Sequence, residues 1–353
     1  MKKLALTAVI LLSGIQVFAQ YNFSELSQTG GYNRSVVTQN GKHASFVLQH
    51  SDATSSSQEN LANINQSNIS EFGIQQSISR VEHYGHLHMS TVIQKGENKL
   101  EAYIGSSGDH NVKNETYSWQ YGLANEGVQR LEGTASKESI LSLKQGGTHN
   151  YSEQIGDQSI RSEGSVLQVG KSNVALQRLE GTVNVGQIVQ TSDENKAFQQ
   201  IVGVGSSANV SVVVQSGNGN SARVVTQGDA NFFNVQQLGN GNEIGGVVDL
   251  LFSNATQEGV GNYVLITQVG KDNAYGIRQS GDDNVISGES ISGALQLGNF
   301  NTGIFSQQGF GLKIITDQYG NNNLQTVTQM GNDSESRVFQ TGGSNMSQIS
   351  QVN

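Results

Sequence analysis

The chain of 353 residues contains no proline and no cysteine, and only 14% of its residues are charged. Without cysteine it lacks the disulfides on which many small secreted domains rely, so its stability must have another source. Proline would remove a hydrogen-bond donor from any strand that is paired on both sides. The net charge of −9 argues against a nucleic-acid partner, which would require a basic face.

Glycine, in contrast, is abundant, with 43 residues, and Gln, Asn and Ser are frequent. Low charge with this composition is compatible with disorder. It is equally compatible with a repeated β structure held together by backbone and side-chain amide ladders. The absence of proline favours the repeated β structure.

The first 19 residues have the pattern of a secretory signal peptide. Lys2 and Lys3 form the charged start, residues 4–12 form the apolar run, and Ala19 closes a small-residue cleavage site. The apolar run is too short to span a bilayer, and no other stretch of the sequence could span one. We therefore expect an exported protein whose mature chain begins at Gln20.

Twelve segments of seven residues share one template, and most are joined by a turn of the form Gln-x-Gly-x-x-Asn. They begin at Asn33, His88, Asn184, Asn209, Asn231, Asn262, Asn273, Asn301, Leu312, Asn323, Ser334 and Asn345, and each ends six residues later at a Gln. From Gln296 onward this Gln recurs at one constant interval, at Gln307, Gln318, Gln329, Gln340 and Gln351. A short period sustained over hundreds of residues indicates a stacked repeat fold.

Residue classes alternate along each segment. The fifth residue is large and apolar in eleven of the twelve segments, and the third is mostly small or polar. All charges in the segments fall on the second, fourth or sixth residue: Arg34, Arg278, Lys313, Asp317, Glu335 and Arg337. Since successive side chains of a strand point to opposite faces, we predict strands whose first, third, fifth and seventh residues face inward and whose charged positions face water.

The turn has its own physical logic. Glycine at its third position permits a positive φ, and Asn at its end tolerates the left-handed region and can bond its own backbone. The remaining positions vary freely, as in residues 268–273 and 318–323. The predicted turn glycines are Gly30, Gly259, Gly270, Gly281, Gly298, Gly309, Gly320, Gly331 and Gly342.

Two strands and two turns together make a repeat of about 22 residues, which we interpret as one rung of a solenoid. The sequence predicts an all-β, amyloid-like β-solenoid of about 15 two-strand rungs, in which two parallel sheets face each other across a thin core. Inward amides would then pair up the stack, because a buried amide without a partner costs about 1–3 kcal/mol. The predicted ladder residues are Gln28, Asn33, Gln39, Gln215, Gln237, Asn262, Gln268, Asn273, Gln279, Gln296, Asn301, Gln307, Gln318, Asn323, Gln329, Gln340, Asn345 and Gln351.

The predicted organisation has four parts: the signal peptide (1–19), a short and loose N-terminal segment (20–27), irregular repeats (28–204), and regular repeats of the same solenoid (205–353). Gln-Arg-Leu-Glu-Gly-Thr occurs at 129–134 and again at 177–182, and Leu179 stands there in the place of the turn Gln. The register of residues 49–82 cannot be assigned from the sequence. The interval from Gln279 to Gln296 is shorter than the full repeat from Gln296 to Gln318, so we expect a shortened connector before a strand over 290–296.

Candidate chemical sites are few. His83, His86 and His88 suggest a metal site, but the repeat explains His83 and His88 as inward ladder residues and His86 as a turn residue. No repeated pair of acids suited to sugar hydrolysis and no nucleophile arrangement is present, and the lone Gly-x-Gly at 217–219 is too weak for nucleotide binding. We therefore expect neither an enzyme nor a cofactor.

The turn Gln-x-Gly-x-x-Asn followed by five residues and another Gln, as at 257–268 and 340–351, resembles the curlin repeat of bacterial curli subunits. The resemblance covers most of 28–351 and is strongest over 205–351. It implies a functional amyloid that crosses the periplasm and then the outer membrane through a dedicated channel with accessory factors. Such subunits polymerise into cell-surface fibres (fimbriae), seeded by a minor nucleator, and serve adhesion and biofilm matrix. The inward residues of the family motif correspond to Gln318, Asn323 and Gln329.

The chain also departs from the family pattern. It has far more repeats than a typical member, both half-turns of each rung carry Gly-x-x-Asn, and the segment before the first repeat is short. The sequence therefore does not decide between a major and a nucleating subunit, and it does not say to what the fibre adheres.

The end rungs of such a solenoid would expose strand edges, and no polar capping helix follows Gln351. Stacking one subunit on another would satisfy those edges and, because the contact does not close, would give a filament. The expected partners are thus further copies of the chain and another curlin subunit. The alternative is a monomeric β-solenoid surface protein or adhesin that binds a glycan, ice or a host ligand.

Overall fold

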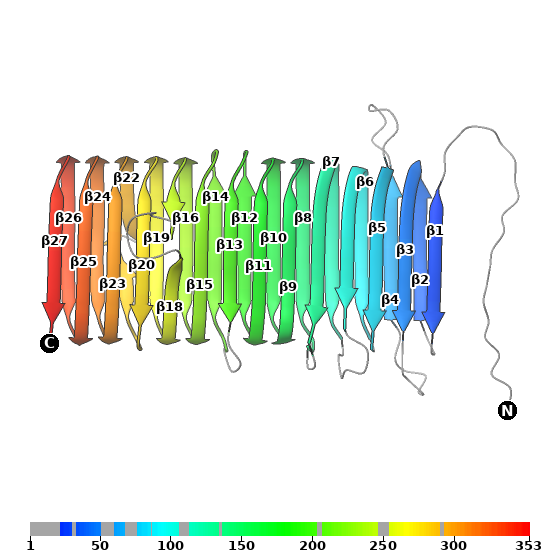
Figure 1. The fold of residues 1–353 in the computed structure, drawn as a ribbon, viewed down its shortest axis with the longest axis horizontal. Helices are drawn as coiled ribbons and strands as arrows, with labels where there is room; N and C mark the ends of the chain where they lie inside the picture. Colours follow the sequence, from blue (N-terminus) through cyan, green and yellow to red (C-terminus); the bar gives the residue numbers. More distant parts are fainter. Residues whose placement is uncertain are drawn as a thin grey trace, which may run out of the picture.

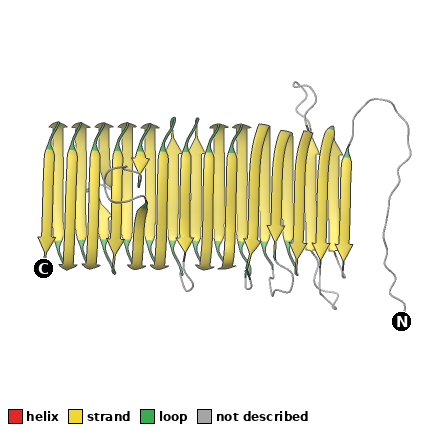
Figure 2. Cartoon of the chain, in the orientation of Figure 1, coloured by secondary structure: helices red, strands yellow, loops and turns green. Residues whose placement is uncertain are grey.

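The computed structural model describes residues 22–29, 33–50, 60–67, 76–85, 87–105, 113–133, 136–202, 207–245, 254–289 and 293–353. Strands make up 80% of this described part, which contains no helix and therefore no helix that could cross a membrane. The strands lie side by side in one elongated stack, with β1 at one end and β27 at the other (Figures 1 and 2). The prediction of an all-β, parallel β-solenoid is confirmed.

All strand pairs are parallel, and they form two series that we call column A and column B. Column A contains β1 (Phe23–Thr29), β3 (Lys42–His50), β5 (Gln76–Tyr84), β9 (Tyr151–Ile160), β11 (Val174–Thr182), β13 (Lys196–Val202), β15 (Ser221–Asp229), β17 (Glu243–Ile244), β18 (Ala255–Val260), β20 (Ala274–Ser280), β23 (Thr302–Phe310), β25 (Leu324–Asn332) and β27 (Met346–Val352).

Column B contains β2 (Asn33–Asn40), β4 (Asn60–Ser67), β8 (Ile140–Thr148), β10 (Glu163–Lys171), β12 (Val185–Thr191), β14 (Val210–Ser216), β16 (Phe232–Asn240), β19 (Tyr263–Lys271), β21 (Val285–Ser287), β22 (Ala294–Asn299), β24 (Lys313–Asn321) and β26 (Glu335–Gly343). Two long strands, β6 (Met89–Ile104) and β7 (Glu115–Glu132), begin in column B and end in column A, so the two columns are continuous there.

The alternation of faces follows the predicted parity. Ile266 and Val327 are fully buried, Ile349 packs against the same core, and Arg278 and Arg337 are exposed. The core consists of one long thin cluster that runs from Val47 to Val338 along the stack and a small second cluster of Ile104, Leu131 and Leu141, as expected for two sheets that face each other at a short distance.

The repeat length, however, is not uniform. Stacked residues are 22 apart in the last coils, as in Gln307 and Gln329, but 21 apart between Gln28 and Gln49 and 34 apart between Gln49 and His83. Residues added between strands lengthen a coil without adding a level to the stack. A rung count of about 15, which assumed one repeat length throughout, is therefore not confirmed.

Two coils are lengthened inside a strand rather than at a turn. In column B, the offset to β19 changes from Tyr263–Val285 to Ile266–Ala294, so six extra residues separate β21 from β22. The predicted shortened connector and the strand over 290–296 are therefore wrong, since β22 begins at Ala294. Gln279 and Gln296 lie in opposite columns, so the interval between them is a half-coil lengthened by the insertion and not a shortened full coil.

A second insertion lies in column A, where the offset to β15 changes from Ser221–Glu243 to Val224–Ala255, which separates β17 from β18 by nine extra residues. Elsewhere the structure assigns registers that the sequence left open. β4 and most of β5 lie within the unassigned stretch 49–82. The expected loose segment 20–27 instead contributes most of β1, which pairs with β3.

One charged residue violates the parity rule. Asp317 occupies an outward position of β24 but is only 3% exposed. Its carboxylate accepts hydrogen bonds from the backbone N–H groups of Glu289 (3.4 Å), at the start of the insertion between β21 and β22, and of Leu295 (3.1 Å), in β22. Burial is the main reason that the pKa of Asp317 is raised.

Candidate functional site

The most regular feature of the molecule is a row of glutamines inside column B. One Gln from each level donates from Nε2 to Oε1 of the Gln at the next level, over distances of 2.7 to 2.9 Å, and no level interrupts the row. Its members are Gln39, Gln66, Gln94, Gln120, Gln145, Gln168, Gln190, Gln215, Gln237, Gln268, Gln296, Gln318 and Gln340. All the bonds point the same way along the stack.

The second proton of each Nε2 ties the two columns together. Gln296 Nε2 also donates to the backbone carbonyl of Ala274 in column A (3.2 Å), and Gln318 Nε2 donates to that of Thr302 (3.2 Å). The amide is thus satisfied both along and across the stack, which is the condition for burying it without a net cost.

Asparagines form a second row at the starts of the column A strands. The Oδ1 of Asn301 accepts bonds from the backbone N–H (3.1 Å) and the Nδ2 (3.0 Å) of Asn323, and that Nδ2 also donates to the carbonyl of Gly342 (3.1 Å). The row is continuous through Asn98, Asn125, Asn150, Asn173, Asn195, Asn220, Asn242, Asn273, Asn301, Asn323 and Asn345.

Column A has its own glutamine row, but in two pieces that occupy different positions. Near the C-terminal end, Gln257, Gln279, Gln307, Gln329 and Gln351 are in register with one another and bond in sequence. In the middle of the chain, the row consists of Gln129, Gln154, Gln177 and Gln199. These lie two residues earlier in their strands, and Leu131, Leu179 and Ile201 are buried at the strand ends.

The structure places the predicted ladder residues as follows. Gln215, Gln237, Asn262, Gln268, Asn273, Gln279, Gln296, Asn301, Gln307, Gln318, Asn323, Gln329 and Gln340 are buried. Asn33, Gln39, Asn345 and Gln351 are partly buried, because they belong to the outermost strands. Gln28 is exposed rather than enclosed, although its Nε2 donates to Gln49 Oε1 (2.7 Å).

The turn glycines are required by both backbone and space. All those predicted have positive φ, from Gly342 at 107° to Gly309 at 142°, except Gly30, which lies outside the described residues. A Cβ on Gly320 would lie 1.9 Å from the carbonyl oxygen of Gly342 on the next level. The glycines Gly259, Gly270, Gly281, Gly298, Gly309 and Gly320 are all blocked in this way by the next level, at 1.7 to 2.0 Å, whereas Gly342 has only Asn345 Nδ2 within 4 Å, at 3.7 Å.

The sequence analysis missed a second constrained turn position, the residue just before the Asn. It too has a positive φ, as in Asp272 (54°), Asn322 (58°) and Ser344 (60°). A signal was present, since Gly, Asp, Asn and Ser recur at that position and all tolerate the left-handed region. Phe300 (57°) shows that the turn imposes this conformation even on a bulky residue.

The buried histidines take ladder positions. His83 lies in column A, where its Nδ1 is 3.4 Å from Gln49 Nε2, and the Nδ1 of His88 accepts from the backbone N–H of Asn114 in column B (3.3 Å). Burial, together with His88, lowers the pKa of His83 to about 3, so the ring is neutral at pH 7. Among the described residues no group of three possible ligands is close enough to hold a metal, and His86 lies outside them.

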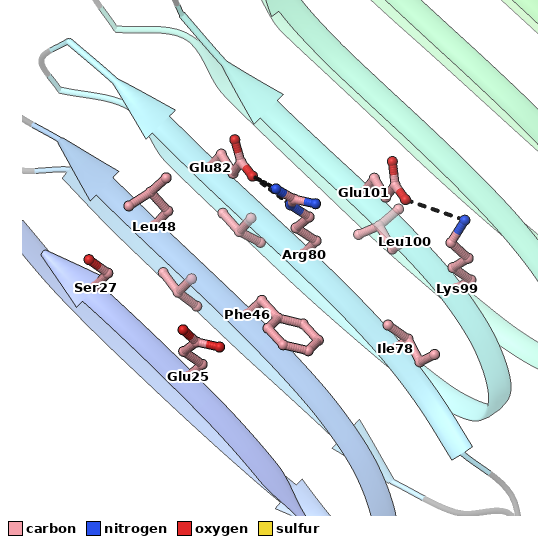
Figure 3. A pocket seen from close by; sticks show the side chains of 12 residues that line it. Glu25, Ser27, Phe46, Leu48, Ile78, Arg80, Glu82, Lys99, Leu100 and Glu101 are labelled. Carbon is pink, nitrogen blue, oxygen red and sulfur yellow. Dashed lines mark hydrogen bonds and ion pairs between the residues drawn. The ribbon is translucent and has the colours of Figure 1, made fainter. Parts of the chain in front are cut away.

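A hollow of about 440 Å³ on the described surface lies over β1, β3, β5 and β6 (Figure 3). Four of the charged side chains that line it form ion pairs: Arg80 with Glu82 (2.5 Å), and Lys99 with Glu101 (3.3 Å) and with the neighbouring Glu126 (2.8 Å); Glu25 lines it as well. The bond to Glu126 is the main reason that the pKa of Lys99 is raised. These opposed pairs offer no separated acid and base.

The two ends of the stack differ chemically. Among the described strands, β1, β2, β26 and β27 pair on one side only. At the C-terminal end, the Nε2 groups of Gln340 and Gln351 have no further Gln to donate to and bond to the carbonyls of Leu324 (3.0 Å) and Glu335 (3.2 Å). At the N-terminal end, Gln39 is the first residue of the column B row, and its Oε1 accepts from Ser24 Oγ (3.5 Å) instead of from another Gln. The C-terminal end of one copy therefore presents amide donors, and the N-terminal end of another copy presents an amide acceptor.

Comparisons with known proteins add no relative. No protein-family model and no curated protein matches this sequence.

Proposed function

We propose that the chain is a secreted structural subunit that assembles head-to-tail, by cross-β stacking, into curli-like amyloid fibres for surface adhesion and biofilm matrix. The proposal rests on one observation. The strands at each end of the stack pair on one side only, and the amide rows that run between the two ends have a single direction. A second copy placed on β26 and β27 would extend both columns, both glutamine rows and the asparagine row.

The edges support assembly in a second way. β26 and β27 are full-length strands of nine and seven residues, and neither carries proline, a bulge or a covering segment in the described structure. Monomeric proteins usually protect such edges. A head-to-tail contact between the two different ends does not close on itself and produces a filament.

We further propose that a coil of about 22 residues is the basic unit, from which the longer coils arose by insertion. Export through the periplasm and across the outer membrane by a curli-type channel, with a second curlin as seed or partner, follows from the repeat resemblance together with the signal-like first 19 residues. The monomeric adhesin remains the competing function, and the following experiment separates the two.

The test uses the purified mature chain, residues 20–353. We expect fibres with reflections near ~4.8 Å and ~10 Å, the spacings of strands and of facing sheets. The informative variant is Gly342→Ala. Its Cβ has room within one molecule, but a carbonyl from an added level would overlap it, as the carbonyl of Gly342 would overlap a Cβ on Gly320.

Gly342→Ala carries the strain of a positive φ (107°) but no clash within one molecule, so it should fold with reduced stability and yet fail to elongate. Gly219→Ala is the matched control, because its φ is also positive (66°) and its Cβ would meet nothing within 4 Å. A mature chain that stays monomeric for days under conditions that polymerise a known curlin would overturn the proposal and favour the adhesin.

A further inference from the structure

Both ends of the described stack terminate in the same column. β1 and β27, the outermost strands, belong to column A, while the outermost strands of column B, β2 and β26, each lie one half-coil further in. Column A therefore has one more level than column B. This mismatch limits how two copies can stack.

If β1 of one copy were added onto β27 of another, column A would continue but column B would have an empty level between β26 and β2. That gap would interrupt the glutamine row between Gln340 and Gln39 and leave two buried amides without partners, at about 1–3 kcal/mol each. If β27 instead took the place of β1 on β3, then β26 would lie on β2 and both columns would continue without a gap.

The sequences of the two strands fit this exchange. β1 reads Phe-Ser-Glu-Leu-Ser-Gln-Thr and β27 reads Met-Ser-Gln-Ile-Ser-Gln-Val. Three positions are identical, and the inward pair Leu26 and Ile349 are both aliphatic. In the register in which β1 pairs with β3, Gln351 would replace Gln28 beside Gln49, and Ile349 would replace Leu26 beside Val47.

The polar contacts at the two ends are also alike. At the N-terminal end, Gln28 Nε2 donates to Gln49 Oε1 (2.7 Å) and Ser35 Oγ (3.3 Å), and Ser35 Oγ donates to the same Oε1 (2.9 Å). At the C-terminal end, Gln329 makes the same contacts with Gln351 (2.8 Å) and Ser336 (3.1 Å), with 2.7 Å from Ser336 to Gln351. If β27 of one copy lay on β3 of a second copy, the contact would repeat this arrangement.

Column B agrees with the same register. Placing β26 on β2 aligns Gln340 with Gln39 and Gly342 with Gly41, which has the same left-handed backbone (φ 107° and 124°). It also brings Glu335 beside Arg34, both exposed on the outer face. Opposite charges on neighbouring strands favour that pairing.

We propose that β1 is a displaceable strand which, within one molecule, occupies the place that β27 of a second copy takes on β3 in the fibre. The proposal rests on the self-assembly proposed above and adds a step to it, in which β1 must leave before a copy can dock. All seven residues of β1 are exposed and it pairs only with β3, so it is the least secured strand of the described stack. Because docking starts only from molecules that have released β1, its rate is proportional to the fraction of molecules in that state.

A reversible lock tests the step. Ser27 and Leu48 are register partners on β1 and β3, and both side chains project from the same face (Figure 3). The pair Ser27→Cys and Leu48→Cys can form a disulfide, and the chain has no other cysteine to interfere. The oxidised variant should stay monomeric, and reduction should restore wild-type polymerisation. The matched control is Ser306→Cys with Thr328→Cys, partners on β23 and β25, whose oxidation should not affect elongation.

The complementary variant begins at residue 30 and lacks β1. Its lag before fibre growth should shorten, by roughly tenfold if β1 is released in about one wild-type molecule in ten. If the oxidised double-cysteine variant and the shortened chain both polymerise as fast as wild type, the strand exchange is wrong while the proposed fibre function stands. If neither wild type nor the shortened chain polymerises, the fibre function itself fails, and the exchange with it.

Discussion

Two regions of column A both bury one Gln and one apolar residue per strand, but they place them in the opposite order. From β18 to β27 the apolar residue comes first and the Gln follows two residues later, as in Ile277 and Gln279. From β7 to β13 the order is reversed, as in Gln177 and Leu179. Column B keeps one order throughout. The two regions show that the fold requires an unbroken amide row within each sheet and leaves the position of that row free.

Hydrogen bonds are lost where the position of the Gln row changes, between β13 and β18. Gln199 has no Gln at the next level, and its Nε2 donates to the Ser211 carbonyl instead (2.7 Å). On the other side of the boundary, Thr226 Oγ1 and Gln257 Oε1 are buried and find no hydrogen-bond partner in the described part of the chain. Continuity of the row, more than the identity of any single residue, therefore stabilises each region.

The largest expected effect tests what the regions share. Gly147 in the irregular region and Gly320 in the regular one have φ of 105° and 109°, and a Cβ on either would lie 2.0 or 1.9 Å from the next carbonyl oxygen. Alanine at either position should cost at least about 3 kcal/mol in the free energy of unfolding, because strain and overlap add. Chemical denaturation measures this.

Gly146 supplies the control, since a Cβ there meets nothing within 4 Å and its φ is not positive. If Gly146→Ala destabilised as much as Gly147→Ala, the levels would not be packed as closely as the structure has them.

The next prediction compares a Gln in the interior of a glutamine row with a Gln at the end of one. Gln268 accepts from Gln237 and donates to Gln296, both over 2.9 Å, whereas Gln257 has a row partner only in Gln279 (2.9 Å). Leucine at 268 leaves partners on both sides unsatisfied, and leucine at 257 leaves one, so the first substitution should cost about 1–3 kcal/mol more. Equal losses of stability for the two variants would show that the rows contribute little.

The smallest effect uses the histidines, all of which lie within the first 149 residues. The pKa of His83 is lowered from 6.5 to about 3 in the folded chain, so between those values the unfolded state binds more protons. Stability should therefore fall as the pH drops below about 6.5, first around β5 and β6. Hydrogen exchange at pH 7 and pH 5 measures this region by region.

His83→Gln should remove much of that pH dependence, because Gln49 holds the same position at the preceding level of column A. His149→Gln is the control, because that ring is exposed. Retention of the full pH dependence in His83→Gln would assign it to other groups.

The parts of the fold that the sequence predicted are those that repeat locally. Alternation of residue classes gave the inward faces, and the spacing of Gln296, Gln318 and Gln340 gave their common column, as the pairing confirms. The assignment of Leu179 to a turn Gln position was also correct, because Leu179 is in register with column A residues on both adjacent levels.

The features that the sequence did not predict depend on neighbours at other levels. The strand pairs β17–β18 and β21–β22 each share one level across an insertion, which only the strands above and below define. The burial of Asp317 follows from the insertion between β21 and β22. The displaced row from Gln129 to Gln199 was missed because both inward positions satisfy the same alternation, so the pattern cannot say which carries the amide.

The shared direction of the amide bonds in column B has a consequence for any polymer of this chain. Side-chain dipoles that point the same way at every level add along the axis, so a fibre is a vector whose two tips are chemically distinct. Incoming subunits would then join the tips at unequal rates, and seeds fixed to a surface would lengthen mainly from one tip.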